Sequence, residues 1–173
     1  MLDIRNQLLQ ETSRFNMEYI ASVIGDDKEK FAELMKLYLK EKDPIPAKAA
    51  WVAEYVCLKH PELIDPYLED LVHSLALFTH PGSRRNSLKI LMQTKIPEDL
   101  QGPLIDICFQ WMSSAEKTVA VKVYAMQIIE NHLELYPELA FELKSIIEDQ
   151  WDKNSAGFKA RGSKVLKRLE KFY

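Results

Sequence analysis

The sequence predicts an all-α chain built from stacked pairs of helices. The 173 residues include only five glycines, and apolar residues recur at helical spacing instead of the alternation typical of strands. Breaks at Pro61, Pro97 and Pro137 lie 36 and 40 residues apart, and each separates one amphipathic segment from the next. A helix pair that returns at this period is typical of an α-solenoid, in which neighbouring pairs bury one another's apolar faces.

The N-terminal quarter of the chain holds three expected helices. Residues 1–15 either form a short docking helix or fray. Asn16 is the expected N-cap of a helix over residues 17–24, which ends at Gly25. Asp26 and Glu29 have the spacing of a capping box, and the helix that they start is expected to stop before Pro44.

The remaining helices follow from apolar stripes bounded by breaking residues. These stripes predict helices over residues 46–60, 62–78, 83–96, 98–112, 117–135, 138–151 and 158–172. We therefore expect a single domain over residues 1–173. It would consist of N-terminal cap helices in residues 1–26 and helix pairs in residues 27–60, 61–96, 97–136 and 137–173.

The turn and helix start at residues 116–125 resemble the HEAT/armadillo-like repeat family. A basic residue opens the second helix of each pair, four positions before an apolar one, at Lys48, Arg84, Lys122 and Arg161. The resemblance covers residues 27–172. It implies a right-handed α-α superhelix of about four HEAT-like helix hairpins, with the second helices on the concave side.

The resemblance also implies a ladder of contacts between repeats. In that family, an acid in the turn and a basic residue about six positions later bridge neighbouring repeats. Asp43 with Lys48 and Glu116 with Lys122 match this pattern, whereas Arg84 and Arg161 have no acid at the matching place.

Charges separate between the two sets of helices. The second helices, taken as residues 44–60, 81–96, 116–136 and 155–173, carry a net charge of +9. The three later first helices, residues 61–79, 97–113 and 137–154, carry −10, and the whole chain carries −3. We hypothesise that the basic side binds a protein or peptide with an acidic surface through Lys48, Arg84, Arg85, Lys122 and Arg161. The alternative is that acidic and basic helices pair with each other and hold the stack in register.

Other function classes find little support in the sequence. No nucleotide-binding, hydrolase or zinc-ligand motif occurs, so we expect a non-enzymatic scaffold without catalytic residue, metal site or cofactor. Exposed acids such as Asp65, Glu69, Asp70 and Asp106 are expected to be solvated. The acidic balance disfavours nucleic acid as a partner. The alternative is that the chain is a HEAT-like DNA-binding protein or a DNA glycosylase of the alkylpurine class. The architecture expected here resembles that of those HEAT-like glycosylases, which use a basic concave groove.

Aromatic and sulfur-containing residues fit a helical core. Cys57 and Cys108 lie in apolar helical segments and are expected to be core thiols. The three tryptophans are expected in the core, while Tyr55 and Tyr124 are candidate binding anchors. No signal peptide and no apolar stretch of about 18 residues occurs, so we expect no membrane contact and a reducing, cytoplasmic setting. The oligomeric state is left open.

Overall fold

The computed structural model describes residues Met1–Tyr173 and contains helices and turns but no β-strand. The all-α prediction is therefore confirmed. Contacts divide the chain into two compact units, unit 1 (Met1–Ile96) and unit 2 (Pro97–Tyr173). The expectation of a single domain over residues 1–173 stays a prediction. None of the helices combines the length and apolar character needed to span a bilayer.

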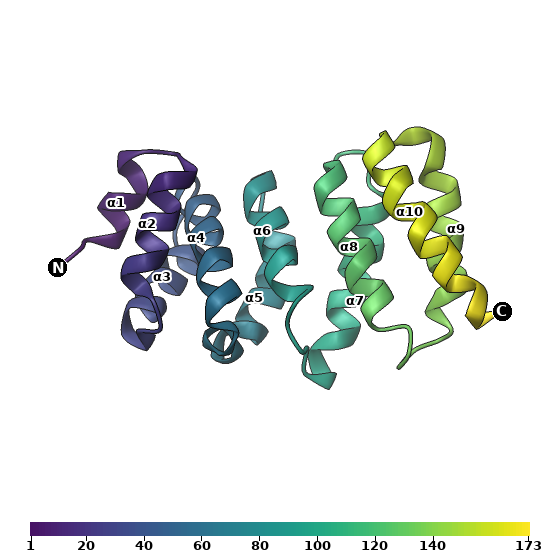
Figure 1. Cartoon of the computed structure of the whole chain (residues 1–173), viewed down its shortest axis with the longest axis horizontal. Helices are drawn as coiled ribbons and strands as arrows, with labels where there is room; N and C mark the ends of the chain where they lie inside the picture. Colours follow the sequence, from purple (N-terminus) through teal and green to yellow (C-terminus); the bar gives the residue numbers. More distant parts are fainter. The chain divides into compact units, whose positions relative to one another are not determined.

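Unit 1 contains three helix pairs arranged in two rows. The first helices of the pairs are α1 (Ile4–Gln10), α3 (Lys28–Lys40) and α5 (Leu68–Ser74). The second helices are α2 (Arg14–Ile24), α4 (Ile45–Lys59) and α6 (Pro81–Leu91). Figure 1 shows α2, α4 and α6 in one row, with α3 and α5 behind it. Because α4 packs against both α2 and α6, these three form one surface, which we call the second-helix layer of unit 1.

A buried polar contact links the two rows of unit 1. Tyr38 of α3 is 0% exposed, and its hydroxyl is hydrogen-bonded to the hydroxyl of Ser87 in α6. Ser87 donates its own proton to the Ser83 carbonyl at 2.5 Å. The Tyr38 hydroxyl is therefore the donor in the first bond. Burial of both groups without this chain of bonds would be costly, so the contact fixes how α3 and α6 pack.

Two predicted caps in unit 1 are wrong by a few residues. Ser13, not Asn16, caps α2, since its hydroxyl accepts from the Asn16 amide at 3.1 Å. Asn16 lies inside the helix, 4% exposed, and its side chain donates to the backbone carbonyls of Gln7 in α1 and Glu11 in the turn. The carboxylate of Asp27, not that of Asp26, caps α3. Gly25 ends α2 as predicted, with a positive φ of 51° that glycine adopts without strain.

The helix predicted over residues 62–78 is interrupted. Residues Pro61–Tyr67 form a 3₁₀ segment, α5 follows at Leu68–Ser74, and Leu75–Leu77 is again 3₁₀. Pro66 lies in the first segment, where it has no N–H to donate and its ring obstructs an α-helical turn. The α-helix therefore starts only beyond this proline. The helix predicted over residues 83–96 also ends early, at Leu91.

Unit 2 repeats the paired arrangement. Its first helices are α7 (Glu98–Ser113) and α9 (Leu139–Gln150), and its second helices are α8 (Val119–Asn131) and α10 (Ala156–Leu169). In Figure 1, α8 and α10 stand in front of α7 and α9, and α8 packs against both α7 and α10. The core is made of side chains that the apolar stripes predicted, including Leu104, Cys108, Met126, Leu143 and Val165, each 0% exposed.

Candidate protein-binding surface

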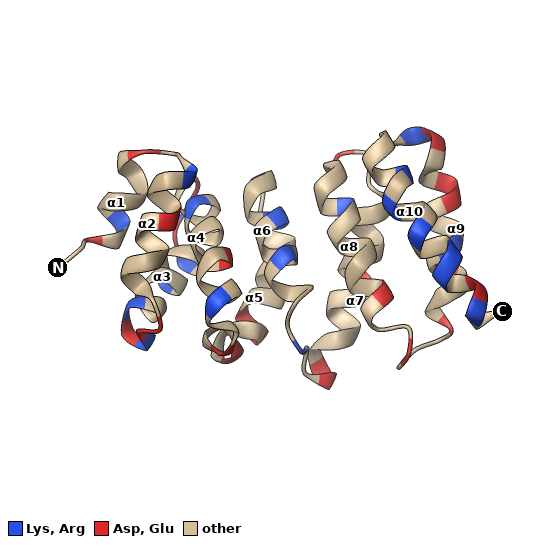
Figure 2. Ribbon diagram, viewed as in Figure 1, with Lys and Arg blue, Asp and Glu red and all other residues tan.

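Acidic and basic residues follow the predicted separation on the later helix pairs, whereas α3, a first helix of unit 1, carries more lysines than glutamates. Figure 2 shows Lys and Arg on α4, α6 and α10, and Asp and Glu on α5, on α9 and at the start of α7. A basic side chain that already pairs with an acid inside its unit is less available to a partner. The salt bridges within each unit therefore show which basic side chains are engaged.

One basic residue of the second-helix layer of unit 1 is paired with a buried acid. The Lys89 ammonium of α6 lies 3.0 Å from a carboxylate oxygen of Glu54 in α4. Glu54 is 3% exposed, so its charge needs a partner inside the fold. Lys89 thus serves to hold α4 and α6 together, which favours the self-pairing alternative for this residue.

Two basic residues of α10 in unit 2 are bound to an acid in the same way. Glu130 of α8 accepts hydrogen bonds from both Arg161 and Arg168 of α10, each at 2.6 Å. One turn further along, Lys171 pairs with Glu134. The hydrogen bond to Glu130 and its charge raise the pKa of Arg168. Arg161, a predicted partner-binding residue, is therefore engaged within the unit.

Replacing Glu130 by glutamine should destabilise unit 2 measurably. The Glu130 side chain is only 9% exposed, and glutamine keeps its shape but removes the charge that holds Arg161. We expect a loss of about 1–2 kcal/mol in the free energy of unfolding, measured by urea denaturation. Glu134→Gln is the matched control, because the Glu134 side chain is 74% exposed and exposed pairs contribute little. Equal losses for the two variants would contradict the assignment of Glu130 as the anchor of α10.

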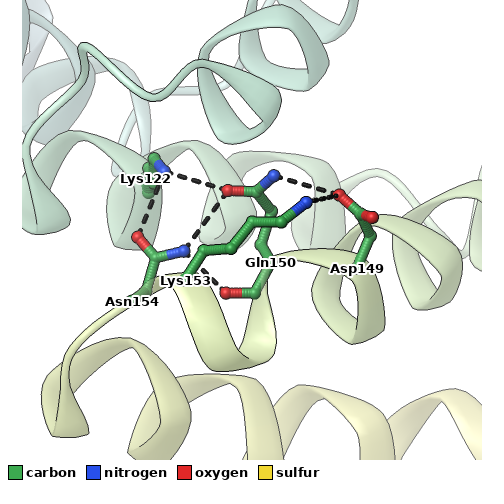
Figure 3. Close-up of polar contacts among 5 residues, drawn as sticks. All are labelled: Lys122, Asp149, Gln150, Lys153 and Asn154. Atoms are coloured by element: carbon green, nitrogen blue, oxygen red, sulfur yellow. Dashed lines mark hydrogen bonds and ion pairs between the residues drawn. The ribbon is translucent and has the colours of Figure 1, made fainter.

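Lys122 is buried and directed into unit 2. The residue is 3% exposed, and its ammonium donates to Gln150 Oε1 and to Asn154 Oδ1, both at 3.1 Å (Figure 3). Asn154 is held in place by donating to the Gln150 carbonyl at 2.7 Å. Burial lowers the pKa of Lys122, and the charge of Lys153 adds to the shift. The ammonium therefore ties α8 to the turn between α9 and α10, a position that does not suit direct contact with a partner.

The ladder implied by the family resemblance takes a different form. Asp43 accepts a hydrogen bond from Thr79, 36 residues later, at 2.9 Å, and no ion pair joins Asp43 to Lys48. Lys122 likewise bonds to amide oxygens and not to Glu116. At these two ladder positions the acid–base pair is thus replaced by other contacts, whereas ion pairs between repeats occur elsewhere, at Glu54–Lys89 and Glu130–Arg161.

Basic side chains without a carboxylate within 4 Å remain in both units. In unit 1 they include Lys59 and Arg85, which are exposed, and Lys48, which is half-buried. Arg84 is half-buried, and its Nε donates to the Phe78 carbonyl at 2.9 Å. In unit 2, α10 exposes Lys164 and Lys167. Of the five predicted partner-binding residues, Lys48 and Arg85 have the placement most suited to that role.

A groove lies between α2 and α4, beside Lys59. Its volume is about 530 Å³, and it is lined by Glu18, Ala21, Ser22, Gly25, Tyr55, Val56, Leu58, Lys59 and His60. The Leu58 side chain is 53% exposed although it is apolar. The acid of the lining, Glu18, is neutralised by Arg14 at 2.8 Å, which leaves Lys59 as the uncompensated charge.

One of the predicted aromatic anchors, Tyr55, lines a cavity. Tyr55 lies in the α2–α4 groove, and its ring packs on Trp51 with centroids 6.4 Å apart. Tyr124 is half-buried in α8. Among the tryptophans, Trp111 is buried at 6% exposure, whereas Trp51 and Trp151 are half-buried. The core assignment therefore holds fully for Trp111 alone.

Sequence reasoning missed the contribution of α2, because residues 1–26 were assigned to a cap. The helix supplies one wall of the groove through Ala21 and Ser22. It also exposes Phe15 by 79% and Tyr19 by 45%. These two aromatics lie four residues apart and off the buried stripe of Met17, Ile20 and Ile24. That second apolar stripe was the available signal that α2 presents a surface of its own.

Burial or solvent exposure accounts for the cysteines, His132 and four of the acids. No group of three or more His, Cys, Asp or Glu side chains is placed to hold a metal ion. Both cysteines are free, and burial raises the pKa of the half-buried Cys57 thiol to about 12 and that of Cys108 further. His132 is 7% exposed, and its Nδ1 lies 2.7 Å from the Ile128 carbonyl within its own helix. The acids Asp65, Glu69, Asp70 and Asp106 are exposed, as predicted.

A comparison with protein families places the chain among helical repeat proteins. The model of the HEAT repeat domain matches residues 4–169. The chain therefore belongs to the HEAT repeat family, and the predicted resemblance and fold class, an α-α solenoid, are confirmed. HEAT repeats form scaffolds that are often used for protein interaction. Comparisons with curated proteins and with solved structures give no significant match.

Proposed function

We propose that this chain is a protein-interaction scaffold that binds an acidic segment of a partner protein along the second-helix layer of unit 1. The observation that carries the proposal is the coincidence of uncompensated basic side chains with a groove. Lys48, Lys59 and Arg85 have no carboxylate within 4 Å, and Lys59 lines the 530 Å³ groove between α2 and α4.

The spacing of the basic residues suits an extended segment. Lys48 and Lys59 lie 11 residues apart on α4, which at about 1.5 Å per residue is roughly 16 Å. An extended segment of about five residues covers that length. Acidic side chains would meet the two lysines, and an apolar side chain between them would enter the groove beside Leu58 and Tyr55.

The charges and the groove have separate roles in this proposal. Opposite charge on the two partners raises the rate of encounter more than it raises the affinity. Salt screens this electrostatic attraction over a distance of roughly 8 Å at physiological ionic strength. An apolar side chain buried in the groove contributes affinity that salt does not weaken. Binding should therefore persist in part at high salt when the segment carries an apolar anchor, and vanish when it does not.

The charge contribution is tested with a fluorescein-labelled peptide of glutamates with one central leucine. By fluorescence anisotropy at low salt, the double variant Lys59→Glu/Arg85→Glu should bind at least 10-fold more weakly than the wild type. This loss corresponds to the coupling energy of a close pair of opposite charges across an interface. The matched control is Lys164→Glu/Lys167→Glu, which changes net charge equally on exposed residues of α10 and should alter affinity less than about 2-fold. Equal weakening by both double variants would mean that only the net charge matters.

The groove is tested with a second variant. Ala21→Trp places a large side chain in the groove and should weaken the leucine-containing peptide without weakening an all-glutamate peptide. Loss of both would contradict a separate anchor site. Duplex DNA is tested in the same assay, because salt-sensitive DNA binding that depends on Lys59 and Arg85 would favour the nucleic-acid alternative instead.

A further inference from the structure

A second groove lies in unit 2, on the first-helix side of its pairs. Its volume is about 430 Å³, and it is lined by Glu98, Asp99, Gly102, Pro103, Ile105, Asp106, Tyr136, Glu138 and Leu139. Asp99, Gly102, Pro103 and Asp106 are spaced i, i+3, i+4 and i+7, so they form one face of α7. The turn before α9 supplies the opposite wall.

The floor of this groove is apolar and fixed in place. Pro103, Ile105 and Leu139 contribute apolar side chains, and Ile105 is 5% exposed. The Tyr136 hydroxyl donates to Gln101 Oε1 at 2.6 Å, which holds the ring of the tyrosine against α7. A Cβ atom added at Gly102 would meet no atom within 4 Å, so the groove is open at this position.

The rim of the groove is acidic and has no internal partner. Glu98, Asp99, Asp106 and Glu138 are exposed, no Lys, Arg or His lines the groove, and none of the four acids forms an ion pair within 4 Å. This differs from the second helices, where Glu54 and Glu130 are each bound by a basic side chain. The self-pairing of charges that accounts for those acids therefore does not account for the four acids at this rim.

The acidic rim and the apolar floor together define what the groove can hold. The groove presents carboxylates above an apolar floor, with the Tyr136 hydroxyl already committed to Gln101. Such a surface is complementary to a side chain with many donors and an apolar stem, which describes arginine.

We infer that the α7–α9 groove binds an arginine-containing basic segment of a partner protein. The guanidinium lies among Asp99, Asp106 and Glu138, and its methylene stem, or an apolar neighbour in the segment, packs on Pro103 and Leu139. This site is separate from the surface of unit 1 proposed above, and it selects the opposite charge. The chain would then bring together two partners of opposite charge, one on each unit.

The test uses a short fluorescein-labelled peptide with two arginines flanking a leucine, and the full chain. At low salt the wild type should bind this peptide, and the double variant Asp99→Asn/Asp106→Asn should bind it at least 10-fold more weakly. This loss corresponds to the coupling energy of a close pair of opposite charges across an interface. The matched control, Asp65→Asn/Asp70→Asn, removes the same charge from exposed acids of unit 1 and should change affinity less than about 2-fold. Circular dichroism and urea denaturation establish that each variant is folded.

A steric variant separates the groove from its charges. Gly102→Phe fills the open position without changing charge, and it should abolish the preference for the leucine-containing peptide over one in which serine replaces leucine. Failure of the wild type to bind at low salt, or equal weakening by the two aspartate variants, would overturn the inference. A salt-sensitive dimer in sedimentation that Asp99→Asn/Asp106→Asn dissolves would also overturn it, in favour of a second copy as the occupant. None of these outcomes depends on whether acidic peptides bind unit 1.

Discussion

Replacing Lys122 by alanine is expected to destabilise unit 2 by about 2–4 kcal/mol, because two costs combine. The change removes the methylene stem of a residue that is 3% exposed, which leaves a cavity. It also removes the closer of the two donors to Gln150 Oε1, leaving the Asn154 amide at 3.3 Å, and Gln150 is itself 5% exposed. Urea denaturation followed by circular dichroism measures the loss.

Lys122→Met is the control that separates these costs. Methionine refills the volume of the stem and removes the buried charge together with its desolvation penalty. We expect this variant to lose less than about 1.5 kcal/mol, the usual limit for a volume-conserving change. If alanine and methionine cost the same, the packing of the Lys122 stem contributes nothing to the fold.

The wild type and the Lys122→Met variant should also differ in how their stability depends on pH. The pKa of Lys122 is lowered in the folded protein, first by burial and then by the charge of Lys153, from an ordinary value of 10.5. Between the lowered value and 10.5, the unfolded chain binds more protons at this site than the folded chain does. The contribution of Lys122 to stability therefore rises as the pH increases through this window. The free energy of unfolding of wild type relative to Lys122→Met should increase over the same range.

Replacing Gly162 by leucine is the second change expected to have a large effect, with a loss of about 1–3 kcal/mol. Gly162 is buried where α10 crosses α9, and an added Cβ would lie 3.1 Å from Trp151 Cζ3 and 3.2 Å from Ile147 Cγ2. Trp151 is half-buried and has room to shift, but Ile147 is 0% exposed and does not. The larger side chain therefore forces α9 and α10 apart. Thermal denaturation of the full chain measures the effect.

Gly102 provides the matched control for this substitution. It also lies within a helix, α7, but a Cβ there meets nothing within 4 Å apart from its chain neighbours. Gly102→Ala is therefore expected to change the free energy of unfolding by less than about 1 kcal/mol, because the gain in helix propensity is opposed by contact of the new Cβ with the ring of Pro103. If Gly162→Leu were as well tolerated as Gly102→Ala, the close approach of α10 to α9 would not limit the residue at position 162.

Local rules in the sequence account for most of the fold. The spacing of Pro61, Pro97 and Pro137 and the apolar stripes between them place the helix pairs in order, because burial of one face per helix needs only the period of the pattern. The boundaries are less accurate. The capping role of Ser13 in place of Asn16, and the 3₁₀ turn around Pro66, depend on which side chain finds a backbone partner in three dimensions.

The candidate site could be predicted only in part. The separation of charge between first and second helices follows from the order of the residues. The partner of each charged side chain does not, because it depends on the distance between helices that lie about 30 residues apart in the sequence. Glu130 neutralises Arg161 across 31 residues, and Lys122 reaches Gln150 across 28. Both basic residues looked available in the sequence, and both are engaged inside unit 2.

By itself, the sequence determined the class of fold, the number and order of the helix pairs after the first, and the opposite net charges of the later first helices and the second helices. Periodicity and composition carry these properties, and neither depends on long-range contacts. Tertiary structure decided which charges are neutralised, that α2 forms a wall of the groove beside Lys59, and that four acids line an open groove beside Gly102. These features arise from how helices distant in sequence pack, so no local pattern specifies them.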